Sequence, residues 1–201
     1  MGTGDSPQFP AIKTDAVKDA GGTKTLAEVS GGEFVWGANV PDGTVWTLAA
    51  EQATTSGTSF DFTGIPAGTK QIVLMGASVS QSSTPDFLVQ IGDSGGIETT
   101  GYLSRYARVS GTHTQSYDHN AGFHLFNDAA SLLNEIVVQL FLQDSANNTW
   151  VASYVTAVYS TTITSYGGGS KSLSGELTQV RFTTTGGTDA FDAGGISIQY
   201  I

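Results

Sequence analysis

The residues best suited to bind a ligand lie in one polar, aromatic stretch, residues 111–123, which reads GTHTQSYDHNAGF. The stretch has no apolar period, so we expect a long loop that serves a function or is ordered by a partner. Aromatic rings can stack on sugar rings, and carboxylate, imidazole and amide groups can hydrogen-bond to sugar hydroxyls. We predict five glycan contacts, four in this loop and one beside a glycine run: Tyr117, Asp118, His119, Asn120 and Tyr166. The alternative is that the same loop packs against a neighbouring subunit.

Three histidines and one aspartate in and beside this stretch could also hold a divalent metal: His113, Asp118, His119 and His124. Imidazole and carboxylate are common ligands of such ions. Their spacing matches no zinc template, and the HxH arrangement that can hold an axial metal in trimeric fibres is absent. We predict no metal and no other cofactor, with the histidines in a solvated loop.

The string GDSGG at residues 92–96 is the one that surrounds the nucleophile of chymotrypsin-like serine proteases. Their mechanism needs a histidine base, which precedes the serine in those chains. Here all three histidines follow Ser94, residue 97 is Ile where the protease pattern has proline, and the chain has no cysteine for the disulfides of that family. We therefore expect a turn in which Asp93 and Ser94 bond local backbone and the glycines take positive φ.

The acidic residues give no better case for catalysis. Glycoside hydrolysis needs two carboxyl groups that face one cleft, and the acids of the central region are scattered singly. They are Asp61, Asp86, Asp93, Glu98, Asp118 and Glu135. Since the sequence selects no pair among them, we predict that the protein is not an enzyme.

Short runs of β-branched and aromatic residues, separated by turn residues, indicate a sheet protein. From residue 44 these runs are TVWTLAA, SFDF, QIVLMGASV, FLVQIG, IETTGYLSRYARV, LLNEIVVQLFLQD, WVASYVTAVYSTTITSY, LTQVRFTTT and GGISIQYI. We expect GGGSKSLSGE to be a turn region and the last run to hold the C-terminus in a sheet. Without heptads or βαβ alternation, the pattern predicts an all-β, antiparallel β-sandwich that is jelly-roll-like.

One segment, residues 132–142, is ambiguous because the apolar density of LLNEIVVQLFL also suits a short buried helix. Ile136, Val138, Leu140 and Leu142 alternate with the residues between them, and β-branched residues occupy the middle of the segment. No capping box precedes it. We therefore expect a strand.

The chain changes character near residue 42. Residues 1–42 are glycine-rich and weakly apolar, so they cannot bury enough surface to offset the ordering of the chain. We expect an extended N-terminal arm with a little strand, which serves as an attachment region. Residues 43–201 carry the main strand signals and are predicted to form the sandwich domain.

The composition narrows the range of partners. Of the 201 residues 13% are charged, well below the typical quarter of a globular chain. Because Ser, Thr, Asn and Gln supply the polar surface, there is little charge to desolvate on contact with copies of the chain or with neutral sugars. The net charge of -10 is the opposite of the basic footprint that nucleic acid requires, so we predict no nucleic-acid partner.

The sequence also gives no sign of a membrane segment or an export signal. Its first residues contain neither a basic nor an apolar signal region, and no apolar run approaches the roughly 20 residues of a membrane span. We expect no membrane partner, and we expect release by lysis as part of a particle.

Four phrases of the sequence resemble segments that recur in virion proteins of tailed bacteriophages, the proteins described as tail fibre, tail protein or head fibre. They are DAGGTKTLAEVSGGEFVWGANVPDGTV, SGTSFDFTGIPAGTKQIVLM, VQIGDSGGIETTGYLSRYARV and SKSLSGELTQVRFTTTGGTDAFDAGGISIQYI. The resemblance covers residues 20–201. It implies an oligomeric, commonly trimeric appendage that touches the host surface, and it brings no catalytic residues with it.

On this resemblance we expect a fibre or spike subunit in the virion, a homotrimer whose arm binds other virion proteins and whose sandwich is displayed outward. Weak contacts of each copy with host-surface glycan would then add up over the particle. Two alternatives are a capsid decoration protein that binds no receptor and a carbohydrate-binding module. Copy number separates the first two hypotheses, because decoration follows the capsid lattice.

Overall fold

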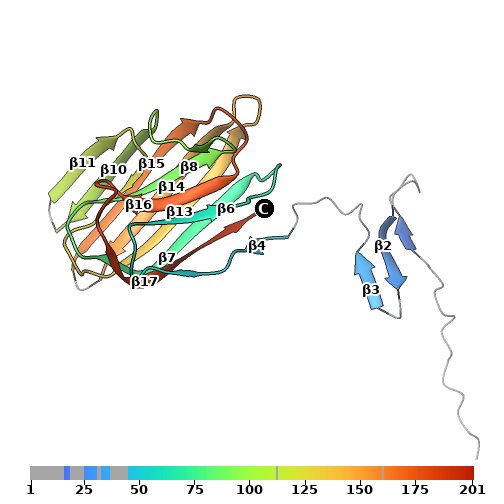
Figure 1. Ribbon diagram of the computed structural model, residues 1–201, viewed down its shortest axis with the longest axis horizontal. Coiled ribbons are helices and arrows are strands. Elements are labelled where there is room, and N and C mark those ends of the chain that lie inside the picture. Colours follow the sequence, from blue (N-terminus) through green and yellow to red (C-terminus); the bar gives the residue numbers. More distant parts are fainter. Residues whose placement is uncertain (1–15, 19–24, 31–32, 37–44, 112, 160) are drawn as a thin grey trace, which may run out of the picture. The chain divides into compact units, whose positions relative to one another are not determined.

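The computed structural model describes residues 16–18, 25–30, 33–36, 45–111, 113–159 and 161–201 (Figure 1). By its internal contacts the chain divides into two units, Met1–Val45 and Trp46–Ile201. The described residues form strands and turns and no helix. Accordingly, none of them belongs to a helix long and apolar enough to cross a membrane.

The described residues of the first unit form a small antiparallel sheet in the order β1, β2 and β3. Its strands are β1 (Ala16–Lys18), β2 (Thr25–Ser30) and β3 (Glu33–Trp36). The remainder of the predicted arm, within residues 1–42, lies outside the described residues. The extended form and the attachment role of this arm stay predictions.

The second unit is a β-sandwich, and the larger of its two sheets has the strand order β11-β10-β15-β14-β13-β7-β17-β4, with β5 also paired to β17. All pairings in this large sheet are antiparallel. Its strands are β4 (Thr47–Leu48), β5 (Gln52–Ala53), β7 (Gln71–Gln81), β10 (Leu103–Ser110), β11 (His113–His119), β13 (Asn134–Asp144), β14 (Thr149–Val158), β15 (Ile163–Ser172) and β17 (Phe191–Tyr200).

The small sheet has the antiparallel order β12-β8-β16-β6, and β9 pairs with β8. Its strands are β6 (Ser59–Thr63), β8 (Phe87–Asp93), β9 (Gly96–Ile97), β12 (Phe123–Leu125) and β16 (Gln179–Thr184). The chain passes repeatedly from one sheet to the other, for example from β6 to β7 and back to β8, as chains do in jelly rolls. The predicted all-β, antiparallel sandwich is confirmed.

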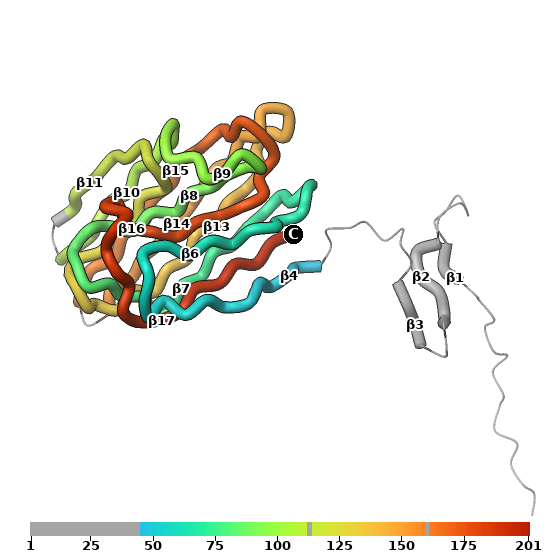
Figure 2. Tube along the Cα trace, in the orientation of Figure 1, coloured from blue at the N-terminus to red at the C-terminus, as the bar shows by residue number. Residues whose placement is uncertain are grey.

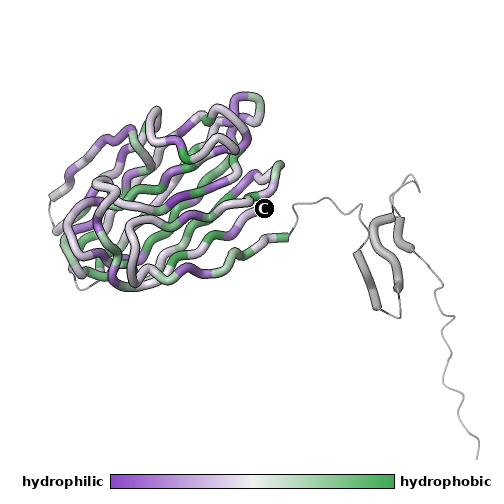
Figure 3. Tube along the Cα trace, viewed as in Figure 1, coloured by the Kyte–Doolittle hydropathy of each residue, from purple (hydrophilic) through white to green (hydrophobic). Residues whose placement is uncertain are grey.

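The ambiguous segment is a strand, as predicted. In β13, Ile136, Val138 and Leu140 are buried, while Val137 and Gln139 between them are exposed. This two-residue period follows from the pleat, which turns successive side chains to opposite faces. Figure 3 shows hydrophobic residues recurring along the strands of this unit.

The core lies between the two sheets and is rich in aromatic rings. The ring of Phe191 lies 5.2 Å from that of Phe60, 5.2 Å from that of Phe182 and 5.9 Å from that of Phe87. Because Phe191 belongs to β17 of the large sheet and the other three to the small sheet, this cluster ties the layers together. Figure 2 shows β17 between β7 and β4, so the final strand is held within the sheet, as predicted.

The segment GGGSKSLSGE, residues 167–176, was predicted to be a turn region, and its first part is wrong, because β15 continues through the three glycines to Ser172 and the chain bends only at residues 174–175. A Cβ on Gly167 would lie 2.2 Å from Cε2 of Tyr154 and 2.5 Å from the carbonyl oxygen of Arg105. The glycines therefore do not bend the chain here. Gly167 leaves room for the ring of Tyr154 against the backbone, and Gly169 leaves room for the carbonyl oxygen of Leu103.

Candidate functional site

The polar stretch at residues 111–123 is not the long loop that its composition predicts. Residues 113–119 form β11, an edge strand that pairs along its length with β10, and residues 123–125 form β12 of the small sheet. An edge strand pairs on one side only, and Thr114 to Asp118 are exposed, so no apolar alternation was available to reveal the strand. The pairing with β10 fixes its register instead.

This strand geometry separates residues that were predicted to act together. Tyr117 stands opposite Tyr106, whose side chain is buried, whereas Asp118 stands opposite the exposed Arg105. Since side chains alternate along a strand, Tyr117 and His119 share one face of the hairpin and Asp118 lies on the other. The five predicted glycan contacts are therefore not one constellation.

Two of the five have other surroundings. The Tyr117 ring lies 5.1 Å from the Tyr106 ring, and its hydroxyl donates to Oε1 of Gln115 at 3.0 Å. Tyr166 lies on β15, opposite Val155 on β14, and is 55% exposed. Tyr117 thus covers a buried tyrosine while its own side chain remains partly exposed, and Tyr166 is exposed on the outer side of the large sheet.

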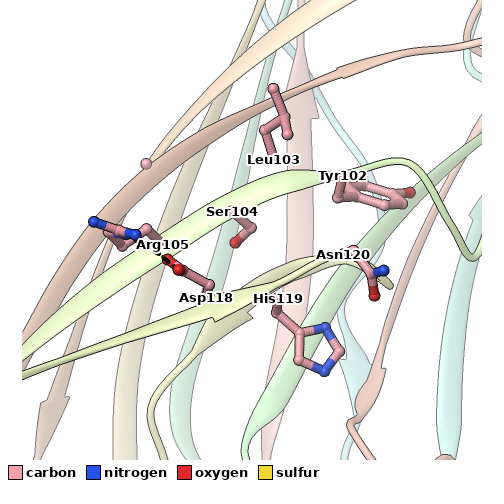
Figure 4. Close-up of a pocket in the computed structure, with 8 residues that line it drawn as sticks. Tyr102, Leu103, Ser104, Arg105, Asp118, His119 and Asn120 are labelled. Carbon is pink, nitrogen blue, oxygen red and sulfur yellow. Dashed lines mark hydrogen bonds and ion pairs between the residues drawn. The ribbon is translucent and has the colours of Figure 1, made fainter.

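The other three predicted residues line a cavity of about 660 Å³ at one end of the β10–β11 hairpin (Figure 4). Strand pairing brings residues from β10 and β15 to the same cavity. The residues that concern its shape and chemistry are Leu103, Arg105, Asp118, His119, Asn120 and Gly168. Sequence reasoning missed the contributions of β10 and β15, because nothing in the spacing shows which strands are neighbours.

An ion pair forms one wall of this cavity. Nη2 of Arg105 donates to Oδ2 of Asp118 at 2.7 Å, and Nε of Arg105 donates to Oδ1. Figure 4 shows these two side chains turned toward each other, with His119 turned away from them. Hydrogen bonding from Arg105 lowers the pKa of the Asp118 carboxyl. The wall is therefore fully charged at neutral pH and has no net charge.

A polar cluster lies where the hairpin meets the small sheet. Nε2 of His124 and the hydroxyl of Tyr106 both contact Oδ2 of Asp86 at 2.8 Å. The His119 ring lies 4.6 Å from the His124 ring, and Nδ1 of His119 accepts from the amide of Ala121 at 3.2 Å. Burial, and after it the neighbouring His124, lowers the pKa of His119.

The side chains of this cluster are not arranged to hold a metal ion, although imidazole and carboxylate are common ligands. Among the residues that the structure describes, no three His, Cys, Asp or Glu side chains are grouped to hold a metal ion. The side chain of His113 lies outside the described set. The predicted absence of a metal therefore stays a prediction, and the histidines lie on strands of two sheets rather than in one solvated loop.

The GDSGG string forms the turn of the β8–β9 hairpin, as predicted, but of its three glycines only Gly96 has the predicted positive φ. Oδ1 of Asp93 accepts from the amide of Gly95 at 2.7 Å, and Oδ2 accepts from the hydroxyl of Ser174 at 2.6 Å. The bond from Ser174, followed by that from Gly95, lowers the pKa of Asp93. Gly96 has φ of 123°, a conformation that favours glycine. Both carboxylate oxygens of Asp93 therefore accept hydrogen bonds that stabilise the turn.

A second candidate surface covers the side of the large sheet that faces away from the core. Val137 stands opposite both Met75 and Val155, Val155 stands opposite Tyr166, and Phe141 stands opposite Val151. We call these residues the apolar outer face: Met75, Val137, Phe141, Val151, Val155 and Tyr166. All but Met75 are between 38 and 55% exposed.

Comparison with protein-family models, with curated proteins and with solved structures finds no match to this chain. The case for a function therefore depends on the cavity, on the apolar outer face and on the phrases of the sequence.

Proposed function

We propose that this chain is a non-enzymatic structural subunit of a bacteriophage particle, a fibre or spike subunit that assembles with copies of itself, most simply as a trimer. Its first unit would attach to other virion proteins, and its sandwich would be displayed on the particle. The observation that carries this proposal is the apolar outer face. The resemblance of the four sequence phrases to phage virion proteins is the reason for proposing a phage particle.

The apolar outer face is unusual for a free surface. Contiguous exposed apolar patches on soluble proteins mark contact sites. Between its two apolar rows lie Val73, Gln139, Ser153 and Gly168, so none of these neighbours is charged, although the chain has a net charge of -10. These rows can be buried without the cost of desolvating ions, whereas Arg105 on β10 and Glu135 on β13 mark where the same face becomes charged.

Copies of the same chain are the partners that this face fits best. Identical rigid sheets can meet around a closed symmetry axis, so every copy buries the same patch. Such a closed arrangement leaves the small-sheet side of each sandwich available for other contacts. The cavity opens on the same outer face as the patch, because Gly168 and Arg105 continue the cross-strand row of Ser153. We therefore place the contact between copies on β7, β13 and β14, which leaves the hairpin end of that face, with the cavity, uncovered. Repeated cavities on one particle would let weak contacts with host-surface glycan add together.

Two measurements test the proposal. Light scattering of the isolated full chain should give three times the mass of one chain, and mass spectrometry of purified particles should find the chain in the copy number of an appendage. A stable monomer at high concentration that is absent from particles would overturn it. Stoichiometry equal to that of the capsid lattice would favour the decoration alternative, and sugar binding by a free monomer would favour a carbohydrate-binding module.

A further inference from the structure

We propose that the cavity at the end of the β10–β11 hairpin binds one ring of a neutral saccharide. This inference names the ligand class for the host contact in the proposed function, but it does not depend on self-association. The argument uses the floor, the apolar wall, the ion pair and the rim of the cavity.

The floor and one wall suit the flat, apolar side of a sugar ring. Gly168 faces the cavity without a side chain, since it lies opposite the exposed Arg105 in the strand register. Leu103, two residues before Arg105 on β10, is 74% exposed and lines the same cavity. The cavity is open to solvent, and its volume of about 660 Å³ has room for one sugar ring.

The polar wall presents hydrogen-bonding groups that are already held in place. Because Arg105 and Asp118 are joined by two hydrogen bonds, the pair lowers the cost of ordering these exposed side chains when a ligand arrives. The guanidinium has five N–H donors and the carboxylate accepts several bonds, so both retain capacity after pairing. Adjacent hydroxyls of a sugar could accept from Arg105 and donate to Asp118.

The rim supplies a group of mixed polarity. Asn120 is exposed, and its amide can both donate and accept, as a hydroxyl ligand requires. Its backbone carbonyl accepts from the amide of Tyr102 at 3.1 Å, which fixes where the chain leaves β11. The rim therefore stands at a defined position relative to the ion pair.

Charge decides the class of saccharide. The cavity wall has one positive and one negative group in direct contact, so it offers no net attraction to an anionic or a cationic ligand. The chain as a whole, at -10, repels anions. The hydroxyls of a neutral sugar ring can hydrogen-bond to both Arg105 and Asp118. Such a ring brings no charge that the wall would leave unpaired or that the net charge of the chain would repel.

The test is saturation-transfer NMR on the full chain with methyl glycosides of glucose, galactose and mannose, with N-acetylglucosamine, and with N-acetylneuraminic acid as the anionic comparison. We expect at least one neutral sugar to bind with a dissociation constant of about 1 mM, as suits a single open site. Asp118→Asn and Asn120→Ala should each weaken that binding by about tenfold, because the first removes the charge of an acceptor and one of the two bonds from Arg105, and the second removes a bond to a hydroxyl.

The small sheet offers a matched control. Arg181 and Asp61 form the same kind of cross-strand pair, with bonds of 2.7 and 2.8 Å, away from the cavity, so Asp61→Asn should leave sugar binding unchanged. No transfer to any neutral sugar, stronger binding of the anionic sugar, or equal loss in Asp61→Asn would each overturn the inference. Light scattering of the same samples reports self-association separately, so the failure of one proposal is distinguishable from the failure of the other.

Discussion

The two sheets of the sandwich present different outer faces. On the large sheet, Val137 and Val155 face each other across two strands and are 38 and 40% exposed. On the small sheet, the paired strands hold Arg181 against Asp61, and the amide of Gln90 donates to the carbonyl of Ala121 at 2.8 Å. Antiparallel sandwiches are normally polar on the outside. The small sheet follows that rule, and the large sheet departs from it in the way expected of a contact surface.

The largest expected effect is a loss of self-association when a charge is placed in the apolar outer face. Val155→Lys should dissociate the assembly, because an ammonium between Val137 and Tyr166 would lose its hydration without gaining a partner. We expect association at least about a hundredfold weaker, a loss of roughly 3 kcal/mol. Light scattering over a dilution series measures this change, and circular dichroism shows whether the sandwich is kept.

The matched control is Thr63→Lys, since Thr63 is exposed on β6 of the small sheet. This variant should assemble as the unmodified chain does. Dissociation by Thr63→Lys together with intact assembly of Val155→Lys would mean that the small sheet makes the contact, and the proposed interface would be wrong.

The unusual outer face also explains what the sequence could and could not reveal. Residues 132–142 resembled a buried helix because Val137 and Phe141, on the outer side of β13, are apolar as well. The alternation of β-branched residues still predicted the strand. The sandwich as a whole was predictable because most strands have one face on the core.

Apolar alternation could not predict the strands whose register is set by pairing with their neighbours. β11 has no apolar face, and β15 contains three glycines, of which Gly167 makes room for the ring of Tyr154, so composition favoured a loop and a turn. The same limit applies to the cavity. Asp118 and Asn120 were predictable from their types, whereas Arg105 and Gly168 reach the cavity through pairings that no local pattern encodes.

The next largest expected effect is a loss of stability from a side chain added at Gly167, on the core side of β15. Gly167→Ala should destabilise the sandwich by about 3 kcal/mol or prevent folding, because the new Cβ meets the Tyr154 ring at 2.2 Å. That ring cannot move freely, since its hydroxyl lies 2.9 Å from Oγ of Ser104. Urea denaturation measures the loss. Gly168→Ala is the control, because its nearest neighbour, the carbonyl oxygen of Ala152, is 3.1 Å away and the change should be much milder.

The large sheet carries Lys171 on its core side, where it pairs with Glu98. Breaking this ion pair should cost less stability than Gly167→Ala. Lys171 is 7% exposed and its Nζ contacts Oε2 of Glu98, while Ser174 donates to Oε1 of Glu98 at 2.8 Å. Burial alone would raise the pKa of Glu98, but the bonds from Lys171 and Ser174 outweigh it and lower that pKa. Glu98→Gln should cost about 2 kcal/mol in urea denaturation, because it leaves a buried ammonium without its counter-ion. The exposed Glu51→Gln should cost little, and equal losses would contradict this account.

The stability of the sandwich should depend modestly on pH through His119, which lies where the hairpin meets the small sheet. The pKa of His119 is below its ordinary value of 6.5 in the folded chain, so the unfolded chain binds the proton more readily. Stability from this group is therefore present above pH 6.5 and declines as the pH falls below it. His119→Gln should reduce the loss measured by urea denaturation between pH 6.5 and about one unit lower. An unchanged pH profile in this variant would show that the burial of His119, with His124 beside it, does not cause the loss of stability.

The smallest effect compares the two cross-strand ion pairs. The side chains of Arg181 and Asp61 are 33 and 37% exposed, against 68 and 66% for Arg105 and Asp118. Solvent and salt screen an exposed pair more strongly, so Asp61→Asn should lower the midpoint of urea denaturation more than Asp118→Asn does. Double-mutant cycles at low and high salt isolate the two coupling energies. A larger coupling in the Arg105–Asp118 pair would mean that this pair stabilises the hairpin, and its fixed geometry would then need no explanation from a ligand.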